Sequence, residues 1–393
     1  MSIGISDLHL LSEGKPPETE EVLKLMTLGR KSWLDYIRER YLQNYIAKGG
    51  SKIKVLVGEK GAGKTHLVRA VLADAKDLGY QTAYLSAYKC RLSDLPTLYQ
   101  EVAKQVVGEH LVRGLCLQIA KQIDETTEYD GSSVFSSYIY DKFPTPKMAD
   151  DKVQEKIAQF FRNTDLSSSF KAFGYRVANN RMVNQSTENI EIACDWLKGL
   201  PADREVSKHR KGLSLYGKLN RTNARDWLNS LVLLCKLAGY KGLVIGIDDL
   251  EAIMEKANTG RYIYSKNQAL DTCELVRQLI DDTEVLSGCL FLLSGRRDII
   301  EDNNRSFRSY NALWARLQIG LADYSKFNPF ADLVDVDKHL AAEDRFLLKI
   351  FEHIKVLIAN QENDFTPPPG YREEASDLQK MVIDAVCSKG GKG

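Results

Sequence analysis

The sequence lacks long hydrophobic runs and an excess of charge of either sign. The best candidate for a membrane-spanning segment, Leu228–Tyr240, is interrupted by Lys236 and falls short of the roughly 20 apolar residues that a bilayer requires. The 54 Lys and Arg residues nearly balance the 53 Asp and Glu residues, which leaves a net charge of +1. This balance argues against a chain whose whole surface binds nucleic acid, although it allows a local basic patch.

Closely spaced cysteines and clustered metal ligands are also missing. The seven cysteines are scattered and mostly lie in apolar contexts, which is typical of reduced thiols in a cytosolic protein. The six histidines stand apart from one another and from the cysteines, so the pattern predicts no zinc site. The N-terminal residues have no basic segment followed by an apolar one, and we therefore expect no signal peptide and a cytoplasmic location.

Strand-like and helix-like segments alternate in a way that predicts an α/β fold. Residues 1–16 are expected to be flexible, and apolar residues then recur at helical spacing from Pro17 to Ala47. A short strand, Ile53–Val57, leads through a glycine-rich loop into a helix at about Lys64–Leu78, and a second strand follows at Thr82–Ala87. This strand–helix–strand unit indicates a parallel sheet with helices on both faces.

A long helical region at about residues 90–240 separates the first two strands from the others. Its amphipathic segments are Leu95–Val107, Leu111–Ile123, Val153–Phe161, Ile190–Leu197 and Ala224–Leu237. Later strands are predicted at Leu243–Ile247, Cys289–Leu293 and Leu333–Val336, with helices at about Leu270–Ile280 and Ser309–Leu317. We predict one domain over residues 17–340 with a helical insertion, a helical C-terminal lid at 341–385 that contains a helix at Glu343–Ile358, and a disordered tail at 386–393.

A glycine-rich loop carries the strongest chemical signal in the chain. Its eight residues match the phosphate-binding pattern G-x-x-x-x-G-K-[ST] in full, and His66 follows on the helix. Glycines let successive backbone N–H groups curl round a phosphate, and the helix directs its positive end at the same anion. The lysine can reach the terminal phosphates, and the threonine hydroxyl can ligate Mg²⁺. The predicted ATP-binding residues are Gly58, Glu59, Lys60, Gly61, Ala62, Gly63, Lys64, Thr65 and His66.

A pair of acids ends the predicted third strand and completes the expected nucleotide site. Asp248 would join Thr65 in the Mg²⁺ shell. Asp249 would position or polarise the attacking water, although many ATPases have the longer glutamate at that place. Glu251 lies two residues further on, so the sequence leaves the water-activating role open between Asp249 and Glu251.

Polar residues follow the predicted fourth strand. Ser294 stands where a polar sensor contacts the γ-phosphate or the water in ATPases that have an extra strand between the two motifs; a turn residue is the equal alternative. Several arginines follow, and one of them is a candidate for an arginine finger that reaches a neighbouring subunit's nucleotide. Our preferred candidate is Arg316, and the others are Arg296, Arg297, Arg305 and Arg308.

A basic stretch and four tryptophans allow a second kind of function. The stretch Arg204–Arg225 is rich in Lys and Arg with few acids, and it is either a DNA-backbone contact or, as the pattern favours, a solvated loop. Trp33, Trp196, Trp227 and Trp314 lie on apolar helix faces, so we predict core positions for them instead of base-stacking platforms.

Several segments together resemble the BrxD-like ATP-binding proteins of BREX phage-defence systems. They are Met26-Thr-Leu-Gly-Arg30, GGSKIKVLVGEKGAGKTHL, ACDWLKGLP, LCKLAGYKGLVIGIDDLE and SYNALWARL, within residues 20–345. Such proteins belong with AAA+ ATPases related to replication initiators of the Orc/Cdc6 kind. The resemblance implies an AAA+-type fold with a helical insertion, ATP and Mg²⁺ binding, and a position for Gly29-Arg30 near the adenine.

These features predict an ATP-hydrolysing AAA+-type subunit of a defence system. The resemblance implies work beside DNA and beside a partner such as a helicase or nuclease, and we expect a homo-oligomer with no membrane contact. Asp249 and the long insertion favour a second hypothesis, a slow-hydrolysing switch or scaffold that recruits effector proteins. A transposition or replication regulator of the same fold is a third, because fold does not fix function.

Overall fold

The computed structural model describes residues 5–27, 30–318, 328 and 330–340, which fall into two compact units. The first unit comprises residues 1–32 and 340–393, and its described helices are α1 (Ile5–Ser12) and α2 (Glu20–Met26). A helix therefore forms within the segment that we expected to be flexible. The buried Asp7 carboxylate accepts the backbone N–H groups of Glu18 and Thr19. The predicted helix Glu343–Ile358, lid and tail lie outside the described residues.

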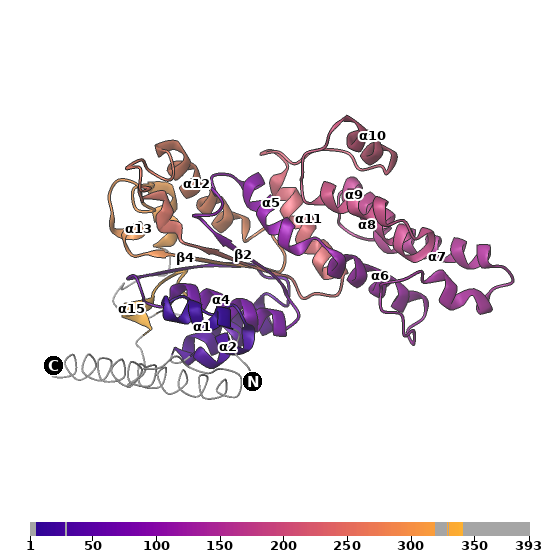
Figure 1. Cartoon of the computed structure of the whole chain (residues 1–393), viewed down its shortest axis with the longest axis horizontal. Coiled ribbons are helices and arrows are strands. Elements are labelled where there is room, and N and C mark those ends of the chain that lie inside the picture. The colour runs from indigo at the N-terminus through magenta and orange to yellow at the C-terminus, as the bar shows by residue number, and fades with distance from the viewer. Residues whose placement is uncertain (1–4, 28–29, 319–327, 329, 341–393) are drawn as a thin grey trace, which may run out of the picture. The chain divides into compact units, whose positions relative to one another are not determined.

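The second unit, residues 33–339, is built on a five-stranded sheet (Figure 1). Its strands are β1 (Lys52–Gly58), β2 (Gln81–Ser86), β3 (Leu243–Asp248), β4 (Cys289–Arg296) and β5 (Leu333–Asp335). They pair in the order β2-β3-β4-β1-β5, and every pair is parallel. The predicted α/β fold with a parallel sheet is confirmed. Because β4 lies between β1 and β3, the glycine-rich loop and the acidic strand end are separated by one strand.

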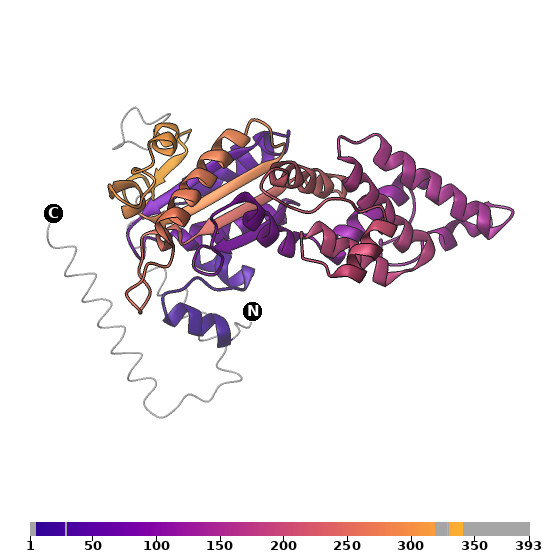
Figure 2. The same ribbon diagram turned by 90° about the horizontal axis from the view of Figure 1, so that it is seen from above.

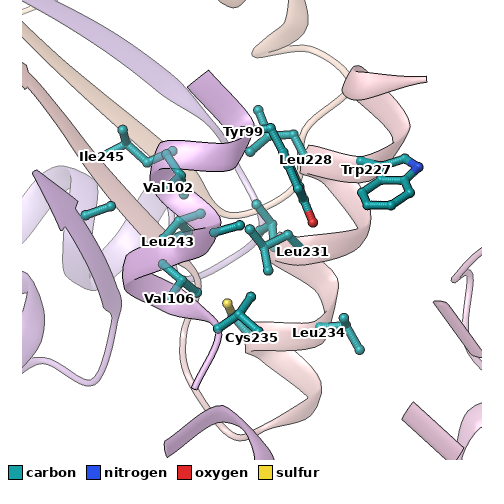
Figure 3. Close-up of a cluster of buried hydrophobic side chains, with 14 of the residues drawn as sticks. Tyr99, Val102, Val106, Trp227, Leu228, Leu231, Leu234, Cys235, Leu243 and Ile245 are labelled. Atoms are coloured by element: carbon teal, nitrogen blue, oxygen red, sulfur yellow. The ribbon is translucent and has the colours of Figure 1, made fainter. Parts of the chain in front are cut away.

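Helices cover both faces of this sheet, which is seen nearly edge-on in Figure 1 and from a second direction in Figure 2. On one face α4 (Lys64–Asp77) packs so closely that a Cβ at Gly246 of β3 would lie 2.7 Å from Cγ1 of Val68. The other face carries a large core between the sheet and α5 (Leu95–Val106), α11 (Ala224–Leu237) and α12 (Lys266–Asp282). Figure 3 shows Leu243 and Ile245 of β3 beside side chains of α5 and α11. Alternate strand residues thus serve opposite faces, as the two-residue period requires.

The helical insertion between β2 and β3 has an aromatic core of its own. Trp196 and Trp227 have ring centroids 4.9 Å apart, and Phe170 contacts both rings at 5.5 Å and 5.3 Å. Trp33 is buried, as are Trp196 and Trp227, so the prediction of a core position is confirmed for these three tryptophans. Trp314 is half-buried. Besides α5 and α11, the insertion contains α6 (Glu109–Ile123), η2 (Ser136–Lys142), α7 (Pro146–Arg162), α8 (Ser168–Asn179), η3 (Asn180–Asn184), α9 (Thr187–Leu197) and α10 (Arg204–Gly212).

We predicted a solvated loop for residues Arg204–Arg225, and this prediction was wrong for the first half of the segment. The segment begins with α10, whose N-cap residue Asp203 accepts the backbone N–H of Val206 at 2.8 Å. An N-cap side chain accepts a backbone N–H of the first turn that has no partner within the helix, so even a short polar sequence can form a helix here. The sequence pattern missed it because charged residues occupy most of its positions.

Shorter elements complete the second unit. They are α3 (Lys31–Tyr36), which begins at the boundary, η1 (Ile37–Tyr45), η4 (Leu250–Ile253), α13 (Asp298–Glu301), α14 (Asn311–Leu317) and α15 (Val336–His339). In the part of the chain that the structure describes, no helix has the length and apolar character to cross a membrane.

Candidate functional site

The glycine-rich loop joins the carboxyl end of β1 to the first turn of α4. Gly61 and Gly63 have φ angles of +87° and +85°, a left-handed conformation that side chains other than glycine rarely adopt. A Cβ added at Gly61 would meet no atom within 4 Å, so the loop faces open space there. Lys64, Thr65 and His66 form the first turn of α4, and the dipole of this helix favours an anion at that end.

The side chain of Lys64 is turned back onto its own loop. Its Nζ donates hydrogen bonds to the carbonyl oxygens of Gly58 at 3.0 Å and Glu59 at 2.8 Å. Burial lowers the pKa of Lys64, and the charges of nearby acids, above all Glu251 and Asp248, oppose that shift. The lysine is therefore positioned between the loop and the acidic strand end, where it would reach a phosphate by leaving these two carbonyls.

Asp248 is fixed at the end of β3 by three donors. Its carboxylate accepts the hydroxyl of Ser294 from β4, the hydroxyl of Tyr84 from β2 at 2.8 Å, and the backbone N–H of Asp249 at 2.9 Å. Asp248 and Ser294 are both fully or almost fully buried. Three hydrogen bonds from separate donors hold this carboxylate in one orientation.

Asp249 follows in a left-handed turn with a φ angle of 62°. This conformation is uncommon outside glycine, although aspartate tolerates it better than most residues. The Asp249 carboxylate accepts the hydroxyl of Ser86 at 2.5 Å. Burial, with the neighbouring charge of Asp248, raises the pKa of Asp249. A raised carboxyl pKa is a common property of groups that accept a proton in a reaction.

Glu251 lies in η4, close to the same strand ends. Its carboxylate accepts the backbone N–H of Arg296 at 3.1 Å, and burial raises its pKa. The side chain of Arg296 is held by Glu255 at 2.6 Å and Asp298 at 2.8 Å. Asp249 and Glu251 thus remain two candidates for the group that activates water, each with a raised pKa and each held by one donor.

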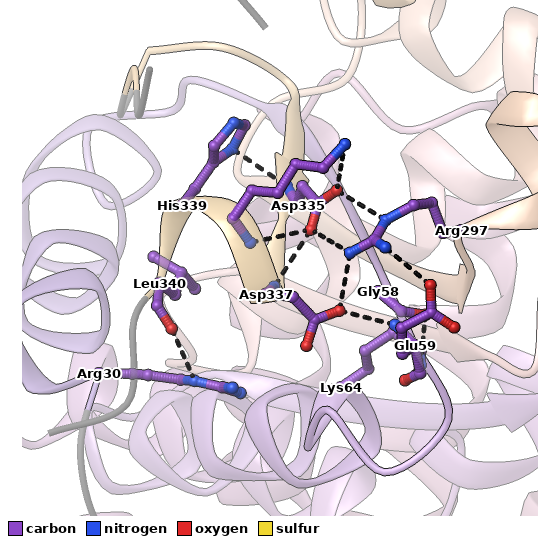
Figure 4. Close-up of polar contacts among 10 residues, drawn as sticks. Arg30, Gly58, Glu59, Lys64, Arg297, Asp335, Asp337, His339 and Leu340 are labelled. Carbon is purple, nitrogen blue, oxygen red and sulfur yellow. Dashed lines mark hydrogen bonds and ion pairs between the residues drawn. The ribbon is translucent and has the colours of Figure 1, made fainter. Parts of the chain in front are cut away.

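A network centred on Arg297 links the glycine-rich loop to β5 and α15 (Figure 4). The guanidinium contacts Asp335 at 2.9 Å and 3.0 Å, Asp337 at 2.9 Å and Glu59 at 2.7 Å. The Asp337 carboxylate also accepts the backbone N–H of Glu59 at 2.7 Å. Asp335 is fully buried and caps α15 by accepting the N–H groups of Asp337 and Lys338. The entry to the loop is therefore held by charged side chains that follow two strand ends.

Two further predicted site residues, Arg316 and Arg30, have contacts of their own. Arg316 of α14 makes a two-pronged ion pair with Asp281 of α12, at 2.5 Å and 3.0 Å, so its predicted role in a neighbouring subunit stays a prediction. Arg30 belongs to the first unit, where its Nε donates to the Leu340 carbonyl at 3.2 Å. Its predicted place near the adenine also stays a prediction, and Gly29 lies outside the described residues.

The sequence pattern missed several residues that shape the site. Tyr84 and Ser86 lie on the same side of β2, and both hydroxyls point to the acidic end of β3. The sequence did hold a signal for them: two polar side chains at positions i and i+2 near the end of a predicted strand lie on the same face of that strand. Arg297 was named only as one of several arginine-finger candidates. Its partners Asp335 and Asp337 were missed because they reach the loop only through the pairing of β5 with β1.

The residues present fit a magnesium nucleotide. Open space beside Gly61, the positive end of α4 and a lysine held nearby make a cradle for phosphate. The hydroxyl of Thr65 and the carboxylate of Asp248 are oxygen ligands of the type that Mg²⁺ prefers. We therefore assign the phosphate position to the loop and the metal position to Thr65 and Asp248 as a proposal.

A comparison with protein families gives one match. A family model described as BREX system ATP-binding protein BrxC/D covers residues 8–365, which include the glycine-rich loop, the insertion and all five strands. No curated protein and no solved structure matches the chain.

Proposed function

The chain belongs to the BREX system ATP-binding protein BrxC/D family, and from that premise we propose that it hydrolyses the ATP that it binds. The observation that carries the proposal is the cluster at the carboxyl edge of the sheet. One site there collects Lys64 and the Asp248 carboxylate, which Ser294 holds by a hydrogen bond. It also includes the carboxyl groups of Asp249 and Glu251, both of which have a raised pKa. An ATP-binding protein that serves only as a rigid scaffold has no need of a buried acid poised to accept a proton.

In this proposal each residue has a separate task. The N–H groups of residues 61–66 bind the β- and γ-phosphates, and Lys64 moves from the Gly58 and Glu59 carbonyls to the γ-phosphate. Ser294 and Tyr84 hold the Asp248 carboxylate in place. Mg²⁺, when bound through Thr65 and Asp248, neutralises the charge that develops on the phosphates. Asp249 accepts the proton of the attacking water, with Glu251 as the second candidate.

The strand order supports an assignment to the AAA+ branch of P-loop ATPases. One strand, β4, lies between the loop-bearing β1 and the acid-bearing β3, and it delivers Ser294 to Asp248. We further propose that the subunit acts as a homo-oligomer in phage defence and couples its nucleotide state to DNA or to a helicase or nuclease partner. The family match supports the defence role, while the assembly and the partners are our proposal.

A slow switch is the second candidate function. Lys64 and Asp249 are both engaged with protein groups, Lys64 with two carbonyls and Asp249 with Ser86, so both have to rearrange before turnover. An ATPase with such a resting state can bind ATP for a long time and recruit effectors meanwhile. Its signature is a change in oligomeric mass on ATP addition with little phosphate release.

The decisive experiment measures phosphate release and nucleotide binding in parallel. We expect the wild type to release phosphate from ATP and Lys64→Ala to lose that activity by about 100-fold or more, because one charge that stabilises the transition state is removed. Lys121→Ala, an exposed lysine at the end of α6, is the matched control and should behave as wild type. Equal rates for Lys64→Ala and wild type would rule out hydrolysis at this loop.

A further inference from the structure

Helix α10 lies in the insertion (Figure 1), and one of its faces carries cationic side chains. Arg204, Lys208 and Lys211 recur at i, i+4 and i+7, so they lie on one side of the helix. All three are exposed, and within the described ranges none of them forms an ion pair. Like charges at this spacing repel one another, so the face is suited to a counterion from outside the chain.

The opposite face of α10 is fastened to the insertion. Arg210 is buried, and its guanidinium donates to the carbonyl of Leu200 at 3.0 Å. Leu213, just past the helix, is buried, and its carbonyl accepts the guanidinium of Arg176 at 3.2 Å. Two anchors, one within the helix and one at its end, fix the rotation of α10. The cationic face is therefore held toward solvent.

Nearby acids do not neutralise this face. Asp203 caps the helix by accepting the N–H of Val206, and Glu205 lies in the first turn, where the helix dipole favours a negative charge. Glu188 and Glu191 on the neighbouring α9 make no ion pair with α10 among the residues that the structure describes.

The loop after α10 extends the cationic surface. Lys218 is exposed and, like the helix cations, has no ion pair in the described part of the chain. Tyr216 is 59% exposed, so its hydroxyl is available as a further hydrogen-bond donor. The loop is held in place, because Nε1 of Trp196 donates to the Gly217 carbonyl at 3.1 Å. Cations elsewhere in the insertion are commonly paired, as in Lys104–Glu101, Arg113–Asp130 and Lys152–Glu155.

We propose that this face, formed by Arg204, Lys208, Lys211 and Lys218 with Tyr216, binds the phosphate backbone of duplex DNA. Arg204 and Lys211 lie about 10 Å apart along the helix axis, at roughly 1.5 Å per residue, so the face spans several phosphates of a duplex. Phosphate contacts of this type position a protein on DNA without selecting a sequence. The inference deepens the proposed function, since it rests on DNA as the partner and assigns the insertion as its contact surface.

The test is binding of a 30-base-pair duplex of mixed sequence, measured without nucleotide over a range of salt concentrations. In Arg204→Glu/Lys208→Glu/Lys211→Glu we expect binding weaker by about tenfold or more, and a log–log salt slope smaller by roughly 3, about one for each lost phosphate contact. The matched control reverses three other exposed lysines, Lys48, Lys121 and Lys147. It should keep the wild-type slope.

Each outcome decides the point. Loss of affinity and slope in the α10 variant alone supports the proposal, while equal losses in both variants, or none in either, overturn it. Should the reversal variant fail to fold, as thermal unfolding would reveal, the neutral triple Arg204→Gln/Lys208→Gln/Lys211→Gln takes its place with the same expected slope. Because nucleotide is absent, a chain that does not hydrolyse ATP leaves this result unchanged, and a failed α10 test leaves the ATPase proposal standing.

Discussion

The hydroxyl of Ser86, the last residue of β2, donates a 2.5 Å hydrogen bond to the carboxylate of Asp249, the first residue after β3. The contact follows from the sheet register, in which Ser86 lies opposite Asp248. The left-handed backbone at Asp249 then turns its side chain toward β2. Ser86, at the end of β2, thus holds the carboxylate of Asp249, which follows the neighbouring strand β3. The effect of this contact on proton transfer can be tested.

We predict that Ser86→Ala moves the acid limb of the ATPase pH profile to higher pH. The Ser86 hydrogen bond stabilises the charged carboxylate and lowers the pKa of Asp249, against the raising effects of burial and of Asp248. Without that bond the pKa rises further. A group that accepts a proton must be ionised, so activity at the acid end falls first. The measurement is kcat against pH.

Ser86→Thr is the control for this prediction, because threonine keeps the hydroxyl at the same position. Its acid limb should stay near that of the wild type. An Ala variant whose limb is unmoved, or moves to lower pH, would contradict a proton-accepting role for Asp249.

A second prediction separates Asp249 from Glu251. Asp249→Asn keeps the shape and the Ser86 contact but cannot take a proton, so we expect kcat to fall about 100-fold or more with ATP affinity retained. Glu251→Gln still accepts the Arg296 N–H, and we expect a loss of about tenfold or less. Single-turnover phosphate release with parallel nucleotide titration measures both. The reverse order of losses would assign the role to Glu251.

The local parts of the site were predictable from the sequence, and the contacts between distant segments were not. Gly58–Thr65 and the strand and helix on either side are contiguous in the sequence, so the motif and its structural surroundings could be predicted together. Asp248 and Ser294 were found because each ends an apolar run. Tyr84 and Ser86 were missed because their roles depend on the pairing of β2 with β3, more than 150 residues later in the chain.

The same reason explains two further differences. Asp335 and Asp337 meet the glycine-rich loop only because β5 pairs with β1, and nothing in their own sequence neighbourhood indicates that pairing. Helix α10 was interpreted as a loop because its apolar positions are few, and its buried face is held by Arg210, a residue type that hydropathy places outside.

A third prediction concerns Arg316, which pairs with Asp281 within one chain. Both side chains are about one-third exposed, so a double-mutant cycle of Arg316→Ala and Asp281→Ala should give a coupling of about 0.5–1 kcal/mol in the free energy of unfolding.

A role of Arg316 in a neighbouring subunit's site is tested by mixing Arg316→Ala with Lys64→Ala protein. The Lys64→Ala subunit would supply Arg316 to an intact loop, and we expect the mixture to recover activity that neither variant has alone. No recovery would exclude the trans role.

A fourth prediction concerns Arg297, which neutralises the fully buried Asp335 and also contacts Glu59 and Asp337. Arg297→Ala removes the closest counterion of the buried Asp335 and leaves it the more distant Lys338, at 3.8 Å, so we expect the free energy of unfolding near pH 7 to fall by about 3 kcal/mol. Arg296→Ala, which breaks only partly exposed pairs, should cost about 1 kcal/mol or less.

The pH dependence of that loss follows from Asp335. Burial would raise the pKa of this carboxyl, but hydrogen bonds from Arg297 and Lys338 outweigh it and hold the pKa below its ordinary value. A lowered pKa contributes stability that is present above the unfolded value of about 3.9 and is lost as the pH falls through the folded value. The difference between wild type and Arg297→Ala in urea unfolding should therefore be full at pH 7 and shrink below about pH 4. A difference that stays constant down to pH 2 would mean that Arg297 stabilises the loop through packing and not through its charge on Asp335.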